Sequence, residues 1–145
     1  MVVIMKISTR GRYGLRIMLD IAVNSGAEPR MVSDICAEQK LSIKYVGRLI
    51  LKLRNAGLVS SVRGAKGGYK IKRSPKHITL LEIIETMEGQ VSLVGCVGCP
   101  KKCKNAQDCV AREIWSELND KIRRDLESIT LQDIINRGGG FDYCI

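Results

Sequence analysis

A glycine-rich loop between two short β-like runs is the feature that most constrains how this chain can fold. The loop spans residues 63–68, and the runs that flank it are residues 58–62 and 69–72. Such runs around a glycine-rich loop predict a β-hairpin. Three helix-like segments precede it. Three helices followed by a hairpin, in this order, predict a winged helix, which is a helix-turn-helix followed by a wing.

Each of the three preceding segments has a helical pattern. Residues 13–23 place apolar residues at intervals of three and four, as on one face of an amphipathic helix. Residues 32–39 suit a short second helix. Ser42 is well placed to cap a third helix, and Gly57 to end it in a left-handed conformation. The apolar stripe of this third helix consists of Val46, Leu49, Ile50 and Leu53.

The second half of the chain predicts a different kind of structure. Thr79 and Glu82 have the spacing of a capping box that opens a short helix through Met87. A Gly- and Cys-rich loop follows at 89–109, and a long helix at 108–127. Its apolar stripe has steps of four residues: Val110, Ile114, Leu118, Ile122 and Leu126, with Trp115 beside it. A lone helix with such a stripe has little of its own domain to pack on, which predicts pairing with a second copy.

Charge is divided unevenly between the two halves. Residues 1–76 contain 16 Lys and Arg against 4 Asp and Glu, whereas residues 77–145 contain 8 against 11. The net charge of +9 therefore originates entirely in the first half. This asymmetry predicts a head that binds a polyanion and a second part with another task.

The basic residues of the head are at positions that we expect to contact DNA in a winged helix. The side of the third helix opposite its apolar stripe carries Lys44, Arg48, Lys52 and Asn55. Such a helix can rest on its core and enter a major groove. In the loop, Arg63 suits a minor groove and Lys66 a phosphate. The start of the first helix adds Arg10, Arg12 and Arg16 as phosphate-binding charge.

Four of the six cysteines fall close together in the loop at 89–109. They are Cys96, Cys99, Cys103 and Cys109. Glycines around them allow several thiolates to converge on one metal ion, which predicts a soft-metal or iron–sulfur site, with redox-active disulfides as an alternative. The zinc-knuckle and ferredoxin spacings are absent. Cys36 is expected to be a buried apolar residue and Cys144 an idle thiol.

Several classes of protein are disfavoured by the sequence. No apolar run approaches the ~18 residues of a membrane helix, and residues 1–5 are too short for a secretory signal, so we expect a cytoplasmic protein that binds no membrane. The single histidine, His77, is expected at the surface. With no nucleophile–base or paired-carboxylate constellation, an enzyme is not predicted. The loop at 63–68 matches neither the Walker phosphate-binding pattern nor the glycine fingerprint of dinucleotide-binding proteins.

The chain resembles the IscR-like family of Rrf-type winged-helix regulators over nearly its whole length. The resemblance lies in residues 5–14 and 53–64, and most specifically in Val62-Arg63-Gly64 followed by Gly67-Gly68-Tyr69. It extends through residues 78–79 and Gly89, then to Trp115 and residues 130–131.

This resemblance implies a homodimer that binds a partly palindromic DNA operator. Ser42, Tyr45 and Arg48 match recognition-helix positions of the family, and Arg63 matches its minor-groove arginine. Gly47 stands where cluster-sensing members carry a glutamate that tunes operator choice.

The resemblance also implies an iron–sulfur cluster, of the [2Fe–2S] type, with zinc as the alternative. Cys103 and Cys109 match two of the family's three ligating cysteines, and either Cys96 or Cys99 can be the first. The family's histidine ligand falls at Arg112, which cannot coordinate a metal, so the extra cysteine is a candidate replacement.

We therefore expect a mainly α protein with a small β-hairpin, divided into two parts. Residues 1–76 form a winged-helix DNA-binding head. Residues 77–145 contain a linker helix, the cysteine-rich cofactor loop (89–109), the dimerisation helix (108–127), and a short final helix with a tail. The predicted function is a transcription regulator, a repressor, that senses cluster or redox status. The alternatives are a zinc- or thiol-sensing regulator on the same scaffold, and a small basic electron-transfer or scaffold protein.

Overall fold

The computed structural model describes residues 7–24, 26–99, 101, 104 and 107–138. The head begins with three helices and a hairpin: α1 (Thr9–Asn24), α2 (Val32–Gln39), α3 (Ile43–Asn55), β1 (Val59–Val62) and β2 (Gly68–Ile71). A 3₁₀ turn and four helices follow: η1 (Pro75–His77), α4 (Leu80–Glu88), α5 (Gly95–Gly98), α6 (Val110–Ser128) and α7 (Leu131–Arg137). The predicted fold class is confirmed.

Local signals in the sequence set several of the helix ends. The Ser42 hydroxyl accepts a hydrogen bond from the Tyr45 backbone N–H at 3.2 Å, which caps α3. Gly57 has φ +77°, so the chain leaves α3 through the left-handed region as predicted. The first helix begins earlier than residue 13, at Thr9.

The capping box predicted at Thr79 is only partly formed, whereas the structure has a complete one at the start of α7. Thr130 and Asp133 form the complete reciprocal pair at the start of α7. At α4 the Thr79 hydroxyl accepts from the Glu82 backbone N–H at 3.1 Å. The Glu82 carboxylate instead forms an ion pair with Arg73, which lies between β2 and η1. Only half of the predicted capping box at Thr79 is therefore formed.

The hairpin is antiparallel and is attached to the head by one extra bridge. Val59 pairs with Ile71 and Ser61 with Tyr69. The Tyr69 backbone N–H donates to the Arg30 carbonyl and the Arg30 N–H to the Tyr69 carbonyl, both at 2.9 Å. A Cβ on Gly68 would lie 2.3 Å from the Arg30 carbonyl oxygen, so this position requires glycine.

One apolar core joins the head to α4 and α7. α4 packs on α1 and α3, and Gly14 of α1 permits close approach, because a Cβ there would lie 2.5 Å from Met87 Cγ. Ile83 and Met87 of α4 and Leu131 of α7 belong to the same buried cluster as the head residues. The core is thus continuous across residue 76, and a division of the chain at that point stays a prediction.

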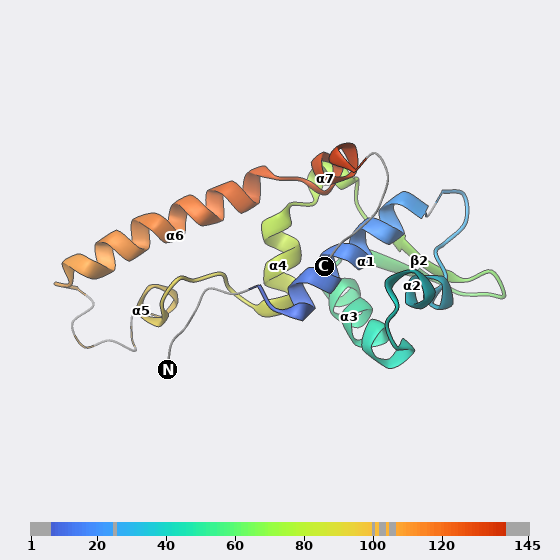
Figure 1. The fold of residues 1–145 in the computed structure, drawn as a ribbon, viewed down its shortest axis with the longest axis horizontal. Helices are drawn as coiled ribbons and strands as arrows, with labels where there is room; N and C mark the ends of the chain where they lie inside the picture. Colours follow the sequence, from blue (N-terminus) through green and yellow to red (C-terminus); the bar gives the residue numbers. More distant parts are fainter. Residues whose placement is uncertain (1–6, 25, 100, 102–103, 105–106, 139–145) are drawn as a thin grey trace.

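The long helix α6 projects from the head as an arm, and α7 at its end returns to the head (Figure 1). The return is fixed by two backbone hydrogen bonds of 2.8 Å, from Leu80 N–H to the Ile129 carbonyl and from Leu131 N–H to the Ile78 carbonyl. The segment 89–109, predicted to be a loop, contains the one-turn helix α5, which packs against α6. No helix in the part of the chain that the structure describes could cross a membrane.

Candidate DNA interface and cysteine site

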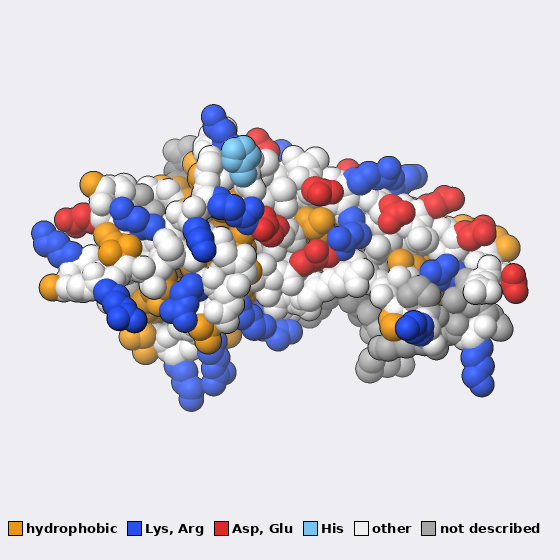
Figure 2. Space-filling view, turned by 180° about the vertical axis from the view of Figure 1, so that it is seen from behind, with side chains coloured by type: hydrophobic (Ala, Val, Ile, Leu, Met, Phe, Trp, Pro, Cys, Tyr) orange, Lys and Arg blue, Asp and Glu red, His pale blue; other side chains and the backbone are white. Residues whose placement is uncertain are grey.

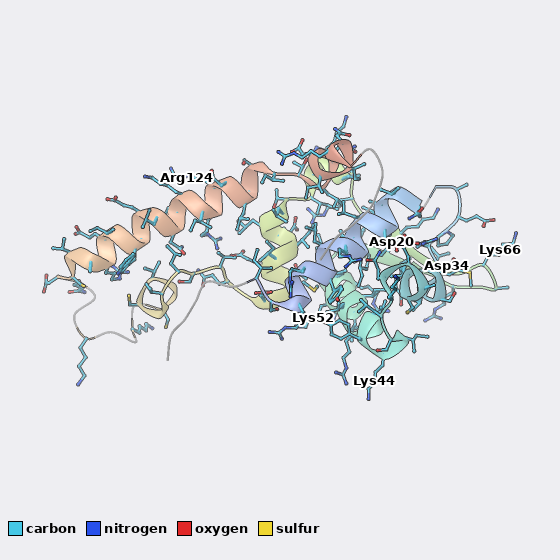
Figure 3. The ribbon with its side chains drawn as sticks, in the orientation of Figure 1. Asp20, Asp34, Lys44, Lys52, Lys66 and Arg124 are labelled. Atoms are coloured by element: carbon cyan, nitrogen blue, oxygen red, sulfur yellow. The ribbon has the colours of Figure 1, made fainter. Side chains whose placement is uncertain are left out.

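The exposed side of α3 is basic, while its other side belongs to the core. Val46, Leu49 and Leu53 are at most 2% exposed. The predicted DNA-binding set of Lys44, Arg48, Lys52 and Asn55 is exposed. Lys44 points away from the body of the head at the start of α3 (Figure 3). Figure 2 shows Lys and Arg as the more frequent charged side chains over the head, whereas Asp and Glu lie among Lys and Arg along the arm.

Ser42 and Tyr45 have structural partners at the start of α3. Ser42 is exposed and caps the helix, as described above. The Tyr45 ring packs edge-on against the Tyr13 ring of α1, with centroids 6.1 Å apart. The Arg16 guanidinium lies 5.5 Å from the Tyr13 ring centroid, a cation–π arrangement. α1 and the start of α3 are therefore held together by an aromatic contact beside the basic surface.

Lys52 links α3 to the end of α4. Its Nζ donates a hydrogen bond to the Met87 carbonyl at 3.3 Å, although the residue remains exposed. Glu88, the next residue, binds the start of α1, where its Oε1 accepts from Ser8 N–H at 2.6 Å and Gly11 N–H at 3.2 Å. The end of α4 is thus bonded to both α1 and α3. Arg10 and Arg12 lie on the exposed side of α1 near this contact.

The loop of the wing presents its two predicted cations to solvent. Arg63 is exposed, and the Lys66 side chain is 84% exposed. Lys66 Nζ lies 3.6 Å from Glu28 Oε1, an exposed pair that contributes little to stability. A groove of about 420 Å³ separates the wing from the start of α2. Its lining includes Arg63, Gly64 and residues 31–33.

The cysteine-rich segment is bonded to the first turn of α6. Cys96 lies in α5, Cys99 directly follows α5, and Cys109 is the N-cap residue of α6. Arg112 Nε donates to the Cys96 carbonyl at 3.3 Å, which ties α5 to α6. These three cysteines are half-buried free thiols. Cys103 and Cys144, by contrast, lie outside the described residues.

The thiols of Cys96, Cys99 and Cys109 do not form a cluster in the structure. Within the described ranges, no three His, Cys, Asp or Glu side chains lie close enough together to hold a metal ion. The donor chemistry nevertheless suits iron or another soft metal, because thiolates are the ligands of such sites. The predicted ligand set therefore stays a prediction.

Two other residues singled out in the sequence can be placed. Cys36, expected to be buried, is partly buried and packs against the core, and desolvation raises the pKa of its thiol above the ordinary value. His77 is exposed at the end of η1.

Sequence reasoning missed a buried polar cluster between α1 and α2. The Asp20 side chain is only 1% exposed and accepts from Arg30 Nε at 2.8 Å and from Gln39 Nε2 at 3.1 Å. Asn24 Nδ2 also donates to it, at 2.9 Å. The one available signal was a carboxylate among the apolar residues of the first helix, since a buried charge requires partners.

These features together define a winged-helix DNA-binding protein with a projecting helical arm. The family model of Rrf2, the iron-dependent transcriptional regulators, matches residues 7–137. The chain belongs to the Rrf2 family. It is accordingly a DNA-binding transcription regulator and not an enzyme, as the sequence predicted.

Relatives in this family have the same fold. The chain is 39% identical to the HTH-type transcriptional regulator CymR of Bacillus subtilis, over 94% of each chain. It is 36% identical to IscR of Escherichia coli, over 91% of this chain and 81% of that protein. The structure of B. subtilis CymR, described as the global cysteine regulator, superposes with a TM-score of 0.75, covering 91% of this chain and 97% of that one. A structure of T. potens IscR, 34% identical, also gives 0.75, covering 97% and 93%.

Proposed function

We propose that the protein is a homodimeric repressor that binds a partly palindromic operator in the cytoplasm and responds to an iron–sulfur cluster in its cysteine-rich segment. The exposed basic side of α3 supports insertion into a major groove. The exposed Arg63 supports a minor-groove contact of the wing. Ser42, Tyr45, Lys44 and Arg48 belong to the proposed base- and phosphate-reading surface, and Arg10, Arg12, Lys52 and Lys66 to its phosphate-binding margin.

The apolar stripe of α6 supports a second copy as the partner of the arm. Val110, Ile114 and Leu118 are 70%, 52% and 40% exposed, and Trp115 beside them is 43% exposed. Exposed apolar residues in a continuous stripe favour burial against a matching stripe, and a two-fold pair supplies one. Two heads carried by paired arms could meet half-sites about 34 Å apart.

The cofactor proposal rests on the donor chemistry and place of the cysteines. Cys103 and Cys109, with Cys96, Cys99 or both, would hold a [2Fe–2S] cluster. When bound, the cluster would supply reversible one-electron chemistry. Arg112, which binds the Cys96 carbonyl, would keep α5 against α6 and limit solvent access to the thiolates.

The observation that carries the sensing proposal is the chain of contacts from this segment to the DNA-binding helices. Leu93 N–H donates to the buried Asn119 Oδ1 at 2.9 Å, and Arg123 pairs with Glu85. The segment and α6 are thereby anchored on α4. The end of α4 in turn binds Lys52 of α3. A change in the segment on cofactor binding can therefore bias the position of α3 relative to the arm.

Anaerobic purification and visible absorption test the proposal directly. A coloured protein with charge-transfer bands is expected, and Cys103→Ser and Cys109→Ser should abolish them. If three cysteines ligate, one of Cys96→Ser and Cys99→Ser keeps the spectrum; if four ligate, each substitution shifts it. Cys36→Ser is the matched control and should leave the bands unchanged. A colourless protein after iron and sulfide reconstitution would contradict cluster binding.

A thiol-sensing regulator is the second candidate. It is favoured by Cys96, Cys99 and Cys109, which are half-buried thiols outside any disulfide. It is also favoured by a similar protein, Staphylococcus aureus CymR, which has a structure in the oxidised form. That chain is 34% identical to this one, with a TM-score of 0.69. Oxidation that changes operator affinity without iron would support it. The third candidate is zinc bound by the same thiolates. Stoichiometric zinc in the purified protein would support that alternative.

A further inference from the structure

We infer that Ile43, at the start of α3, reads the methyl group of a thymine base in each half-site of the operator. The inference rests on the proposed operator binding through α3 and adds a specificity-determining residue to it. Ile43 is the first residue of the helix, directly after the Ser42 cap, and 68% of its surface is exposed. Residues at the start of a recognition helix are the ones that reach base edges in the major groove.

Ile43 lies outside the apolar core and is bordered by cations. The core takes Val46 and Ile50 from the same helix, but not Ile43. The next residue, Lys44, points away from the body of the head (Figure 3), and Arg48, one turn further along, is exposed as well. Neighbouring cations favour DNA as the partner of this apolar side chain, because charged residues are depleted from the centre of protein–protein interfaces.

The chemistry of the exposed side of α3 selects the base. The helix contains no Asp or Glu, and the side chains of Lys44 and Arg48 can only donate hydrogen bonds. In the major groove, cytosine presents a donor, adenine a donor beside an acceptor, and guanine two acceptors. Only thymine presents a methyl group next to an acceptor. An isoleucine followed by a lysine is therefore complementary to thymine.

Gly47 leaves the adjacent turn of the helix open. It is exposed, and nothing lies within 4 Å of a Cβ placed there. Residues four apart are neighbours on a helix surface, so Gly47 lies next to Ile43. Without a side chain at residue 47, the backbone of α3 can approach the bases until Ile43 touches the methyl group at about 4 Å.

Removal of single methyl groups from the operator tests the inference. An operator is selected from random duplexes, and each thymine is exchanged in turn for uracil at the equivalent positions of both half-sites, which preserves base pairing. At one position the Kd of the parent protein, measured by fluorescence anisotropy, should rise about fourfold for each half-site, because burying one methyl group contributes about 0.8 kcal/mol. In Ile43→Ala the same exchange should leave the Kd unchanged, since alanine is too short to cover the methyl group.

Leu51→Ala is the matched control. Leu51 is an apolar residue of the same helix, 48% exposed and about two turns beyond Ile43. Its variant should respond to the uracil exchange by the same factor as the parent. Both substitutions change exposed side chains, so thermal unfolding of the two variants should follow that of the parent.

Two results would overturn the inference and leave the proposed repressor function standing. One is an operator on which no thymine methyl group is coupled to Ile43, and the other is coupling that disappears in Leu51→Ala instead. Failure to enrich any duplex from the random pool would contradict the proposed operator binding and the inference together.

Discussion

Exchange of Ile114 and Leu118 for glutamate should separate the proposed dimer. Both side chains lie on the arm with 52% and 40% of their surface exposed. Burial of a whole Ile or Leu side chain contributes about 1.5–3 kcal/mol, so the exposed half of each contributes about 1 kcal/mol when a partner covers it. A two-fold pair buries both residues twice, which amounts to about 4 kcal/mol.

That free energy corresponds to a roughly thousandfold increase in the dimer dissociation constant. Burying the introduced carboxylates adds to the effect. Sedimentation equilibrium over a wide range of protein concentrations measures the constant. Arg124→Glu is the matched control, because Arg124 is an exposed residue of the same helix away from the stripe (Figure 3). A double variant that dimerises as the parent does would refute the assignment of this stripe to the interface.

Three further outcomes are expected. Arg63→Ala should weaken binding to an operator selected from random duplexes by about 1–3 kcal/mol in fluorescence anisotropy, and equal losses on random DNA would reduce Arg63 to a phosphate contact. Gly47→Ala should stabilise α3 by up to about 1 kcal/mol in urea unfolding, because nothing lies within 4 Å of a Cβ at Gly47; destabilisation would contradict this geometry. The hydrogen bonds from Thr130 lower the pKa of Asp133. The folded pKa lies below the unfolded value of about 3.9, so the contribution of the cap to stability is complete above that pH and is lost as the pH falls through the folded pKa. Hydrogen exchange of α7 should show this loss, and Asp133→Asn should remove the pH dependence; an identical pH profile in that variant would contradict it.

In the proposed sensing path, the end of α4 connects the arm to the DNA-binding helices. Met87 and Glu88 bind α3 and α1, and Glu85 binds Arg123 of the arm. A change in the cysteine segment therefore has a short covalent and hydrogen-bonded route to the recognition helix.

The sequence by itself determined the local structure and the type of DNA-binding head. The apolar stripe and Ser42 cap of α3, the glycine at residue 57, and the hairpin all depend on residues within a few positions of one another. Their physical causes, which are helix periodicity, capping and backbone freedom, can be read from a short segment. The same holds for the cysteine spacing and the uneven charge, which indicated the kind of chemistry.

Only the tertiary structure decided which distant groups meet. Asp20 with Gln39, Lys52 with the Met87 carbonyl, and Arg30 with Tyr69 join residues 19, 35 and 39 positions apart. The short helix α5 is likewise held by α6, because a four-residue segment has too little internal hydrogen bonding to be stable alone. Such contacts depend on how the faces of several helices pack, and packing is a property of the whole core rather than of any local pattern.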